Sequence, residues 1–229
     1  MIEKILPAAV ASAEALEDPP DAVLYPGEAE LVIRAVDKRR REFRTARHCA
    51  RQALEQLGLP LMAVLRGERG DPQWPPGVVG SITHCSGYRA AAVARSRDIY
   101  ALGIDAEPNE PLPAGVLDAI ALAPEHRRLS QLAAADEMTH WDRLLFCAKE
   151  SVYKAWFPLA HRWLGFEDAS VTIELGATDP TRGTFAARLL VPGITNTGPP
   201  LTGFDGHWLR TDKLVITAIA LPATWTSSP

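Results

Sequence analysis

Cysteine is scarce in this chain of 229 residues, which contains only Cys49, Cys85 and Cys147. The three are widely spaced, odd in number and form no CxxC pair, so the sequence indicates neither a disulfide framework nor a zinc site. A reducing, cytoplasmic compartment is the expected setting for such a chain.

Long apolar runs are also missing, and without a stretch of about 18 apolar residues no membrane-spanning helix is expected. The first residues, Met1 to Pro7, carry Glu3 and Lys4 and lack the apolar centre of a signal peptide. Neither a GxSxG nor a Walker motif occurs, so the sequence gives no support for serine-hydrolase or P-loop chemistry.

An excess of positive charge is absent as well, because the formal net charge is -4. This balance argues against general nucleic-acid binding. The basic residues are nevertheless concentrated in one stretch, opposed there only by Asp37 and Glu42, and the stretch could bind a compact polyanion. Its eight members are Arg34, Lys38, Arg39, Arg40, Arg41, Arg44, Arg47 and Arg51.

The basic stretch falls within a predicted helix over Ala29–Leu57, either continuous or broken near Asp37. Gly58 and Pro60 end this helix. Apolar residues recur there at spacings of three and four, and the arginines form a stripe beside that apolar face. The apolar residues are Phe43, Ala46, Ala50, Leu54 and Leu57. Residues 1–27, which are rich in proline, are expected to be irregular.

Short strands and helices are expected to follow. Small and β-branched residues predict strands at Val78–His84, Tyr88–Arg95, Ala101–Glu107, Ala169–Leu175, Thr184–Val191, Gly206–Arg210 and Lys213–Leu221. The last two form a hairpin over a turn at Thr211–Asp212. Helices are predicted at Val116–Ala135 and Thr139–Phe157, with Pro158 discouraging continuation.

The segment Pro108–Pro113 resembles a linker, and the order of elements is similar before and after it. We therefore predict an α+β protein with two subdomains, residues 1–108 and 109–229, each a mainly antiparallel sheet with packed helices.

The segment Gly103-Ile104-Asp105-Ala106-Glu107 carries the first candidate site. Residues two apart on a strand point to the same face, so Asp105 and Glu107 would present two carboxylates together. Paired oxygen ligands suit a hard cation such as Mg²⁺. The alternative is an acidic strand end that faces solvent.

A second candidate lies in Phe146 to Lys154, where Phe146, Glu150 and Lys154 share one helix face. Glu150 and Lys154 could bind metal and phosphate respectively. They could also form an exposed ion pair worth about 0.3–0.5 kcal/mol. Apolar neighbours on both sides favour a buried helix over that alternative.

Two glycine-containing segments form a third candidate, GERGDP from Gly67 and GSITHC from Gly80. The first would let backbone approach a ligand closely. The second places Ser81, Thr83 and His84 at a strand end, where hydroxyls and an imidazole can bind phosphate oxygens. Taken alone, a histidine such as His84 is more often a structural residue than a ligand.

In this order the motifs resemble the Sfp-type 4′-phosphopantetheinyl transferases, most closely the actinobacterial PptT-like branch. The matching text is RRREFRTARHCAR (39–51), GERGDPQWP (67–75), GSITHC (80–85), GIDAEP (103–108), FCAKESVYKAWFPL (146–159) and RWLGFEDA (162–169). The resemblance spans residues 30–221. Phe146-Cys147 departs from the wider family, in which Trp and a small hydroxyl residue are commoner, but is typical of this branch.

The resemblance implies a pseudo-dimer with coenzyme A and a metal in the cleft between its halves. Asp105, Glu107 and Glu150 would hold Mg²⁺, with Mn²⁺ as the alternative. The 3′-phosphate end would be bound by Arg39, Arg47 and His84, with Arg66 near the adenine and Ser81 and Lys154 at the pyrophosphate. Lys149 would orient the nucleotide or the helix. Phe146, Tyr153 and Trp163 are candidates for the pantetheine slot, or are plain core aromatics.

The implied reaction transfers phosphopantetheine to a serine of an apo acyl or peptidyl carrier protein and releases adenosine 3′,5′-bisphosphate. Glu150 would remove the serine proton, directly or through water, while Lys154 and the metal stabilise charge, with Asp105 as a ligand. Carriers of polyketide or non-ribosomal peptide synthesis, including siderophore pathways, are the favoured partners. The expected state is a monomer that binds neither nucleic acid nor membrane.

Three other functions stay open from the residues. A metal-dependent phosphoesterase could use the same carboxylates to hydrolyse a nucleotide. A non-catalytic binder of coenzyme A would need the basic helix but not all three carboxylates. A nucleic-acid protein is disfavoured by the net charge and by the few aromatics among the arginines.

Overall fold

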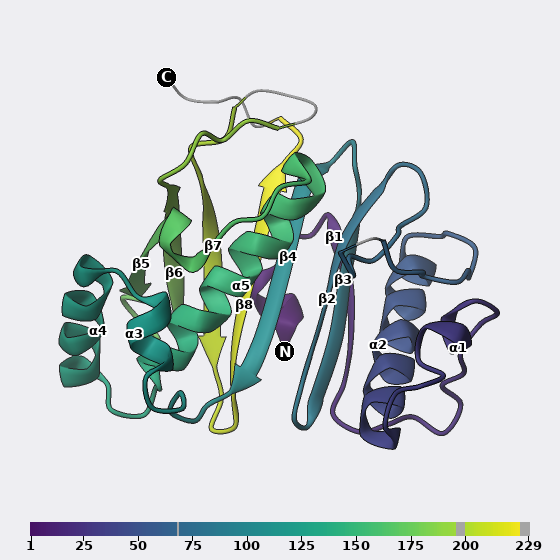
Figure 1. Ribbon diagram of the computed structural model, residues 1–229, viewed down its shortest axis with the longest axis horizontal. Helices are drawn as coiled ribbons and strands as arrows, with labels where there is room; N and C mark the ends of the chain where they lie inside the picture. The colour runs from purple at the N-terminus through teal and green to yellow at the C-terminus, as the bar shows by residue number, and fades with distance from the viewer. Residues whose placement is uncertain (68, 196–199, 225–229) are drawn as a thin grey trace.

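The computed structural model describes residues 1–67, 69–195 and 200–224, which form two antiparallel sheets (Figure 1). The first sheet has the order β1-β3-β2 and contains β1 (Val10–Ala15), β2 (Val78–Cys85) and β3 (Tyr88–Arg95). The second has the order β4-β8-β7-β6-β5 and contains β4 (Ile99–Pro108), β5 (Ala169–Leu175), β6 (Arg182–Leu189), β7 (Gly203–Arg210) and β8 (Leu214–Pro222). The predicted α+β class with antiparallel sheets is confirmed, as are all seven predicted strands within a few residues.

Helices cover these sheets on separate sides (Figure 1). The chain forms α1 (Glu28–Leu31), α2 (Asp37–Gln56), α3 (Val116–Ile120), α4 (Ala123–Ala135) and α5 (Trp141–Ala160), and the 3₁₀ helices η1 (Ile2–Ile5) and η2 (Phe166–Asp168). Helix α2 packs on the three-stranded sheet, while α5 packs on β4 and β8 of the five-stranded sheet.

Strand β3 is buried on both faces because its side chains are small. Ala90, Ala92 and Ala94 pack with the apolar side chains of β4 and β8. Ala91 and Val93 face the other way and pack with α2. The three-stranded sheet therefore has α2 on one side and the second sheet on the other.

Strand β4 shows the predicted alternation of faces. Ile104 and Ala106 lie in the core shared with β3. Gly103 lies under α5, and a Cβ atom there would stand 2.1 Å from the carbonyl oxygen of Ser151 and 2.8 Å from the backbone nitrogen of Ala155. Glycine is therefore what lets α5 rest directly on β4.

Strands β2 and β4 belong to different sheets and lie side by side. They are joined by hydrogen bonds between side-chain hydroxyls of β2 and backbone amides of β4. The Ser81 hydroxyl accepts a hydrogen bond from the Ile104 amide at 3.0 Å. The Thr83 hydroxyl accepts one from the Ala106 amide, also at 3.0 Å. We call these two contacts the hydroxyl seam.

The expectation that residues 1–27 are irregular is wrong. Residues 10–15 form β1, which pairs antiparallel with β3 in a register that places Val10 opposite Ala94. The prolines that suggested irregularity lie outside this strand, at positions 7, 19, 20 and 26. Three alanines of β1 pack on the α2 side and alternate with Ser12 and Glu14, but alanine is depleted in strands, so this alternation is a weak signal.

Two helix boundaries also differ from prediction. Helix α5 continues through Pro158 to Ala160, and His161 ends it in a left-handed conformation with φ 48°. Pro158 is tolerated there because Leu159 and Ala160 still pack into the core. The helix predicted over Val116–Ala135 is two helices, since Ala121 and Leu122 are extended and Pro124 lies in the first turn of α4.

The division at residue 108 stays a prediction, and so does the similarity of the two halves. Strand β4 lies before that boundary, although it pairs with β8 of the five-stranded sheet. Among the described residues, no helix combines the length and apolarity needed to cross a membrane.

Candidate active site

A cavity of about 520 Å³ lies between α2, β2, the loop 66–74, the start of β4 and the second half of α5. Its volume falls in the usual range for a site that encloses a small ligand. Positive charge dominates its wall, through Arg39, Arg47, Arg66, Arg69 and Lys154. Asp71 and Glu150 are the acidic side chains among the described residues that line it.

Arg39 and His84 meet at the basic end of the cavity. The Arg39 guanidinium lies within hydrogen-bond distance of His84 Nε2. Burial, reinforced by the nearby Arg39 charge, lowers the pKa of His84 to about 4. His84 is therefore neutral at neutral pH, and an entering anion would meet one fixed cation beside a polar ring.

Arg47 is the most deeply placed arginine of the cavity, with 5% of its surface exposed. Its guanidinium lies 4.1 Å from the centre of the Phe43 ring, and its Nε donates to the carbonyl oxygen of Val64. Burial lowers the pKa of Arg47 to about 10, so it keeps its charge at neutral pH. Arg51 lies one helical turn further along α2. It forms an ion pair with buried Glu28 at 2.9 Å and does not line the cavity.

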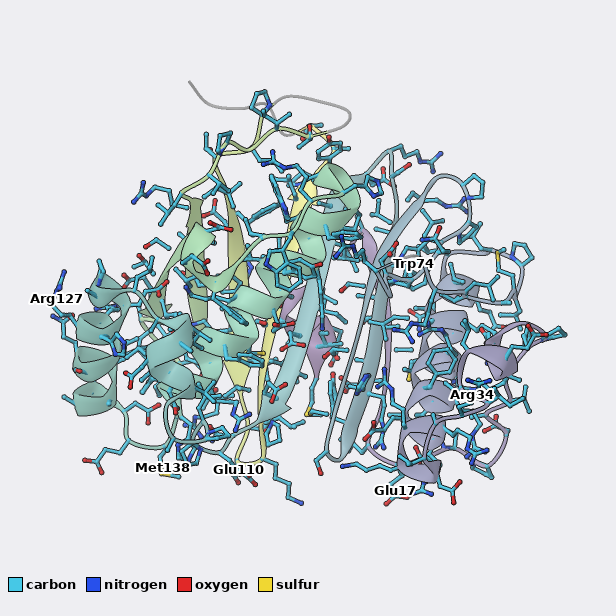
Figure 2. All side chains as sticks on the ribbon, viewed as in Figure 1. Glu17, Arg34, Trp74, Glu110, Arg127 and Met138 are labelled. Atoms are coloured by element: carbon cyan, nitrogen blue, oxygen red, sulfur yellow. The ribbon has the colours of Figure 1, made fainter. Side chains whose placement is uncertain are left out.

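The loop 66–74 forms the outer wall. Arg66 and Pro72 form an isolated bridge, and Gly70 adopts φ +88° at the turn between them, where glycine is favoured. Trp74, labelled in Figure 2, packs its indole on Gly80 of β2. Glu68 of the GERGDP segment lies outside the described residues.

The opposite end of the cavity holds Glu150 and Lys154, one turn apart on α5. Lys154 donates 2.7 Å to Oδ1 of Asp105 on β4. Burial, followed by the charge of Asp105, raises the pKa of Glu150 above its usual value. Burial lowers the pKa of Lys154, but the charge and hydrogen bond of Asp105 and the charge of Glu150 together outweigh burial, so the pKa is raised. Glu150 is thus a stronger base than an exposed glutamate.

Glu107 is held from another direction. Arg143 donates 3.0 Å to Oε2 of Glu107, and its other nitrogens donate to the carbonyl oxygens of Glu110 and Pro111. Burial and the charge of Asp105 raise the pKa of Glu107, although Arg143 partly offsets them. Asp105 and Glu107 lie beside the cavity and are not part of its wall.

The three carboxylates fit a hard divalent cation by their chemistry. Each is an oxygen donor, and the pKa values of Glu107 and Glu150 both respond to the charge of Asp105. Asp105 is 5% exposed, and its Oδ2 is a buried oxygen without a hydrogen-bond partner. In the described part of the chain the three do not form a closed cluster of metal ligands.

Several predicted site residues lie away from the cavity wall. Lys149 is buried on the other side of α5, where it donates to Glu125 at 3.0 Å and to the carbonyl oxygens of Phe166 and Ala169. Phe146 packs on Phe166, with ring centres 5.8 Å apart. Neither lines the cavity.

Two further predicted residues lie at or beneath the cavity surface. Trp163 is 70% exposed and packs its ring on Tyr153, 5.1 Å away, which does line the cavity. Ser81 lines the cavity but is 3% exposed, because its hydroxyl belongs to the hydroxyl seam.

The structure adds residues that the sequence did not single out: Phe43, Arg69, Trp74 and Arg143. Arg69 and Trp74 lie in or next to the glycine-containing segment that is predicted from the sequence to approach a ligand, so that segment could have indicated them. Arg143 gave none, because its three acceptors are brought to it only by the fold.

Comparison with known proteins matches both halves of the chain. Residues 27–94 match the 4′-phosphopantetheinyl transferase N-terminal domain, and residues 101–188 match the 4′-phosphopantetheinyl transferase superfamily. The chain is 56% identical to 4′-phosphopantetheinyl transferase Npt of Nocardia iowensis over 96% of its own length and 99% of that protein's.

Two further relatives extend this result. Identity to 4′-phosphopantetheinyl transferase PptT of Mycobacterium tuberculosis is 52%, over 96% of this chain and 98% of that one. Identity to enterobactin synthase component D of Salmonella typhimurium is 30%, over 80% and 72% of the two lengths. The chain therefore belongs to the 4′-phosphopantetheinyl transferase superfamily, and it is an enzyme of that class.

Proposed function

We propose that the protein transfers the 4′-phosphopantetheine arm of coenzyme A to a serine of an apo acyl or peptidyl carrier protein, with release of adenosine 3′,5′-bisphosphate. One observation carries the proposal. A single cavity has arginines and His84 at one end and Glu150 with Lys154 at the other. Such a cavity suits a ligand with a phosphorylated nucleoside at one end and a pyrophosphate at the other.

The nucleoside end would lie against α2 and the loop 66–74. Arg39, Arg47 and His84 are the proposed partners of the 3′-phosphate, with Arg66 beside the base. One guanidinium group can donate two parallel hydrogen bonds to two oxygens of a phosphate, which suits Arg39 and Arg47 to this role. Arg47 contributes a charge already fixed by Phe43 and Val64, so little side-chain entropy is lost on binding.

The pyrophosphate would lie near Lys154 and Ser81, beside the carboxylates. Asp105, Glu107 and Glu150 are the proposed holders of Mg²⁺ or Mn²⁺, which when bound would neutralise charge on the pyrophosphate oxygens. Lys154 would move its hydrogen bonds from Asp105 to a phosphate oxygen and stabilise the charge that develops there.

Glu150 is the proposed acceptor of the serine proton, directly or through a water molecule. Its raised pKa supports this role, because a base works best when its pKa approaches the working pH. Tyr153, with Trp163 packed on it, offers an apolar surface for the pantetheine arm at the same end of the cavity. Phe146 lies further off, against Phe166, and would act through that packing.

Lys149 has a different proposed role. Its three hydrogen bonds to groups outside the cavity favour orientation of α5 over contact with the nucleotide. We further propose that the enzyme acts as a monomer and serves carriers of polyketide or peptide synthesis.

The test is the intact mass of an apo carrier domain incubated with the protein, coenzyme A and Mg²⁺. The expected result is a gain of one phosphopantetheine arm, which is lost with Glu150→Gln and with added chelator. Coenzyme A cleaved without a change in carrier mass would indicate a phosphoesterase, and coenzyme A bound without either change would indicate a binding protein.

A further inference from the structure

The two carboxylate oxygens of Asp105 have different surroundings. Oδ1 accepts hydrogen bonds from the Thr83 hydroxyl at 2.9 Å and from Lys154 at 2.7 Å. Oδ2 is buried and has no partner among the described residues. A buried oxygen without a partner is costly unless a ligand satisfies it.

Thr83 can present its proton in one direction only. A hydroxyl has a single hydrogen to donate. The Thr83 oxygen already accepts the Ala106 amide hydrogen at 3.0 Å, and the side chain is 2% exposed, so solvent does not compete. Oδ1 of Asp105 is the acceptor that remains for its proton.

Ser81 provides an internal comparison. It occupies the equivalent place in the hydroxyl seam two residues earlier on β2 and accepts the Ile104 amide hydrogen at 3.0 Å. It is about as buried as Thr83, but among the described hydrogen bonds its hydroxyl has none with Asp105. Contact with the carboxylate therefore distinguishes Thr83 from a residue that only joins the sheets.

We propose that Thr83 is a positioning residue that fixes the Asp105 carboxylate so that Oδ2 alone is presented to a divalent cation. The inference rests on the proposed function, since it assumes that Asp105 holds the metal. Hydrogen bonds from the protein to a ligating carboxylate orient it, and their loss typically weakens metal binding about 10–100-fold.

The test measures Mn²⁺ binding to the full chain, without coenzyme A, by the loss of the electron paramagnetic resonance signal of free Mn²⁺. Thr83→Val keeps the shape and removes the hydroxyl, so it should weaken binding about 10–100-fold. Thr83→Ser keeps the hydroxyl and should restore affinity to within about threefold of the wild type. Ser81→Ala should also stay within that range.

Thr83→Cys covers the case in which the valine variant does not fold. Its thiol is a weaker donor of similar size, so its Mn²⁺ affinity should fall between those of the serine and valine variants. Equal affinity for cysteine and serine variants would overturn the inference. So would a loss in Ser81→Ala as large as that in Thr83→Val, because the effect would then come from loosening the seam.

The carrier-mass assay separates this inference from the proposed function. A wild-type protein that modifies the carrier, together with folded Thr83 variants of unchanged Mn²⁺ affinity, would overturn the role of Thr83 alone. A wild-type protein that neither binds Mn²⁺ nor modifies the carrier would overturn both.

Discussion

Lys149 and Lys154 lie five residues apart on α5 and have opposite surroundings. Lys149 is buried among three acceptors, Glu125 and the carbonyl oxygens of Phe166 and Ala169, and lies away from the cavity. Lys154 lines the cavity, keeps 26% of its side chain exposed and bonds to Asp105 and the carbonyl oxygen of Ile104.

The difference shows that one face of α5 carries a lysine that stabilises the fold, while another face carries a lysine that lines the cavity. Burial lowers the pKa of Lys149. Burial also lowers the pKa of Lys154, but the neighbouring carboxylates, Asp105 first, outweigh burial and raise it. The hydrogen bonds of Lys149 all go to protein acceptors outside the cavity, so it is not available to a ligand. Lys154 lines the cavity and can replace its hydrogen bond to Asp105 with one to a ligand. We therefore expect substitutions of Lys149 to act on folding and substitutions of Lys154 to act on transfer.

The largest expected effect is on stability. Lys149→Met would leave Glu125, which has almost no exposed surface, as an unpaired buried charge. Breaking a buried ion pair in this way costs about 3–5 kcal/mol of unfolding free energy, measurable by urea unfolding. The double variant Glu125→Gln/Lys149→Met removes both charges and keeps an amide oxygen that can accept from the Leu122 or Val171 backbone amide, so it should recover part of that loss. A single variant as stable as the wild type would break the comparison.

Lys154→Met should affect the chemistry instead. Removing one group that stabilises developing charge lowers kcat about 10²–10³-fold. Asp105 is buried and loses its ion-pair partner in this variant, so the unfolding free energy should also fall, but by less than in Lys149→Met because 26% of the Lys154 side chain is exposed. The rate of carrier modification at saturating coenzyme A measures the effect, and an unchanged kcat with a raised KM would show that Lys154 only binds the ligand.

His84 sharpens the comparison through pH. Its pKa of about 4 in the folded state lies below the 6.5 of an unperturbed histidine, so the unfolded state binds more protons between these values. Stability is therefore complete above about pH 6.5 and falls as the pH drops towards 4. We expect His84→Gln to reduce this acid loss by about 1–2 kcal/mol, a figure that allows for its partial exposure. Urea unfolding of both proteins at pH 7 and 4.5 measures the difference.

The smallest predicted effect concerns Glu42, which faces the cations at the basic end. Its Oε2 lies 3.9 Å from Arg39 Nη1 and 3.8 Å from His84 Nδ1. Glu42→Gln removes this competing acid and should tighten coenzyme A binding up to about fivefold, in line with a weak ion pair. Calorimetry with chelator present measures the affinity, and the gain should shrink at high salt. A weaker affinity would mean that Glu42 orients Arg39 for the ligand.

Much of this arrangement could be predicted from local pattern. The alternation around Asp105 placed Ile104 and Ala106 in the core, and the spacing of Glu150 and Lys154 placed both on one face of α5. These inferences need only the period of a strand or a helix. Strand β1 escaped prediction because its partner, β3, lies far along the chain and three of its six residues are alanine, which is depleted in strands.

The remaining features depend on contacts between distant segments. Lys149 and Glu125 are a buried pair only because α4 and α5 pack together, and nothing in either helix alone distinguishes Lys149 from Lys154. Arg143 reaches Glu107 across 36 positions. A family motif groups such residues by sequence, whereas the structure separates those that support the site from those that line it.

The close crossing at Gly103 limits how this enzyme can diversify. Any side chain there would meet the backbone of α5 at Ser151 and Ala155, and lifting the helix would move Glu150 and Lys154 away from Asp105 together. Selection for a new ligand or carrier therefore cannot proceed by widening the gap between β4 and α5. Variation is easier at exposed positions such as Arg69, Gln73 and Trp163, which lie outside the strands and helices.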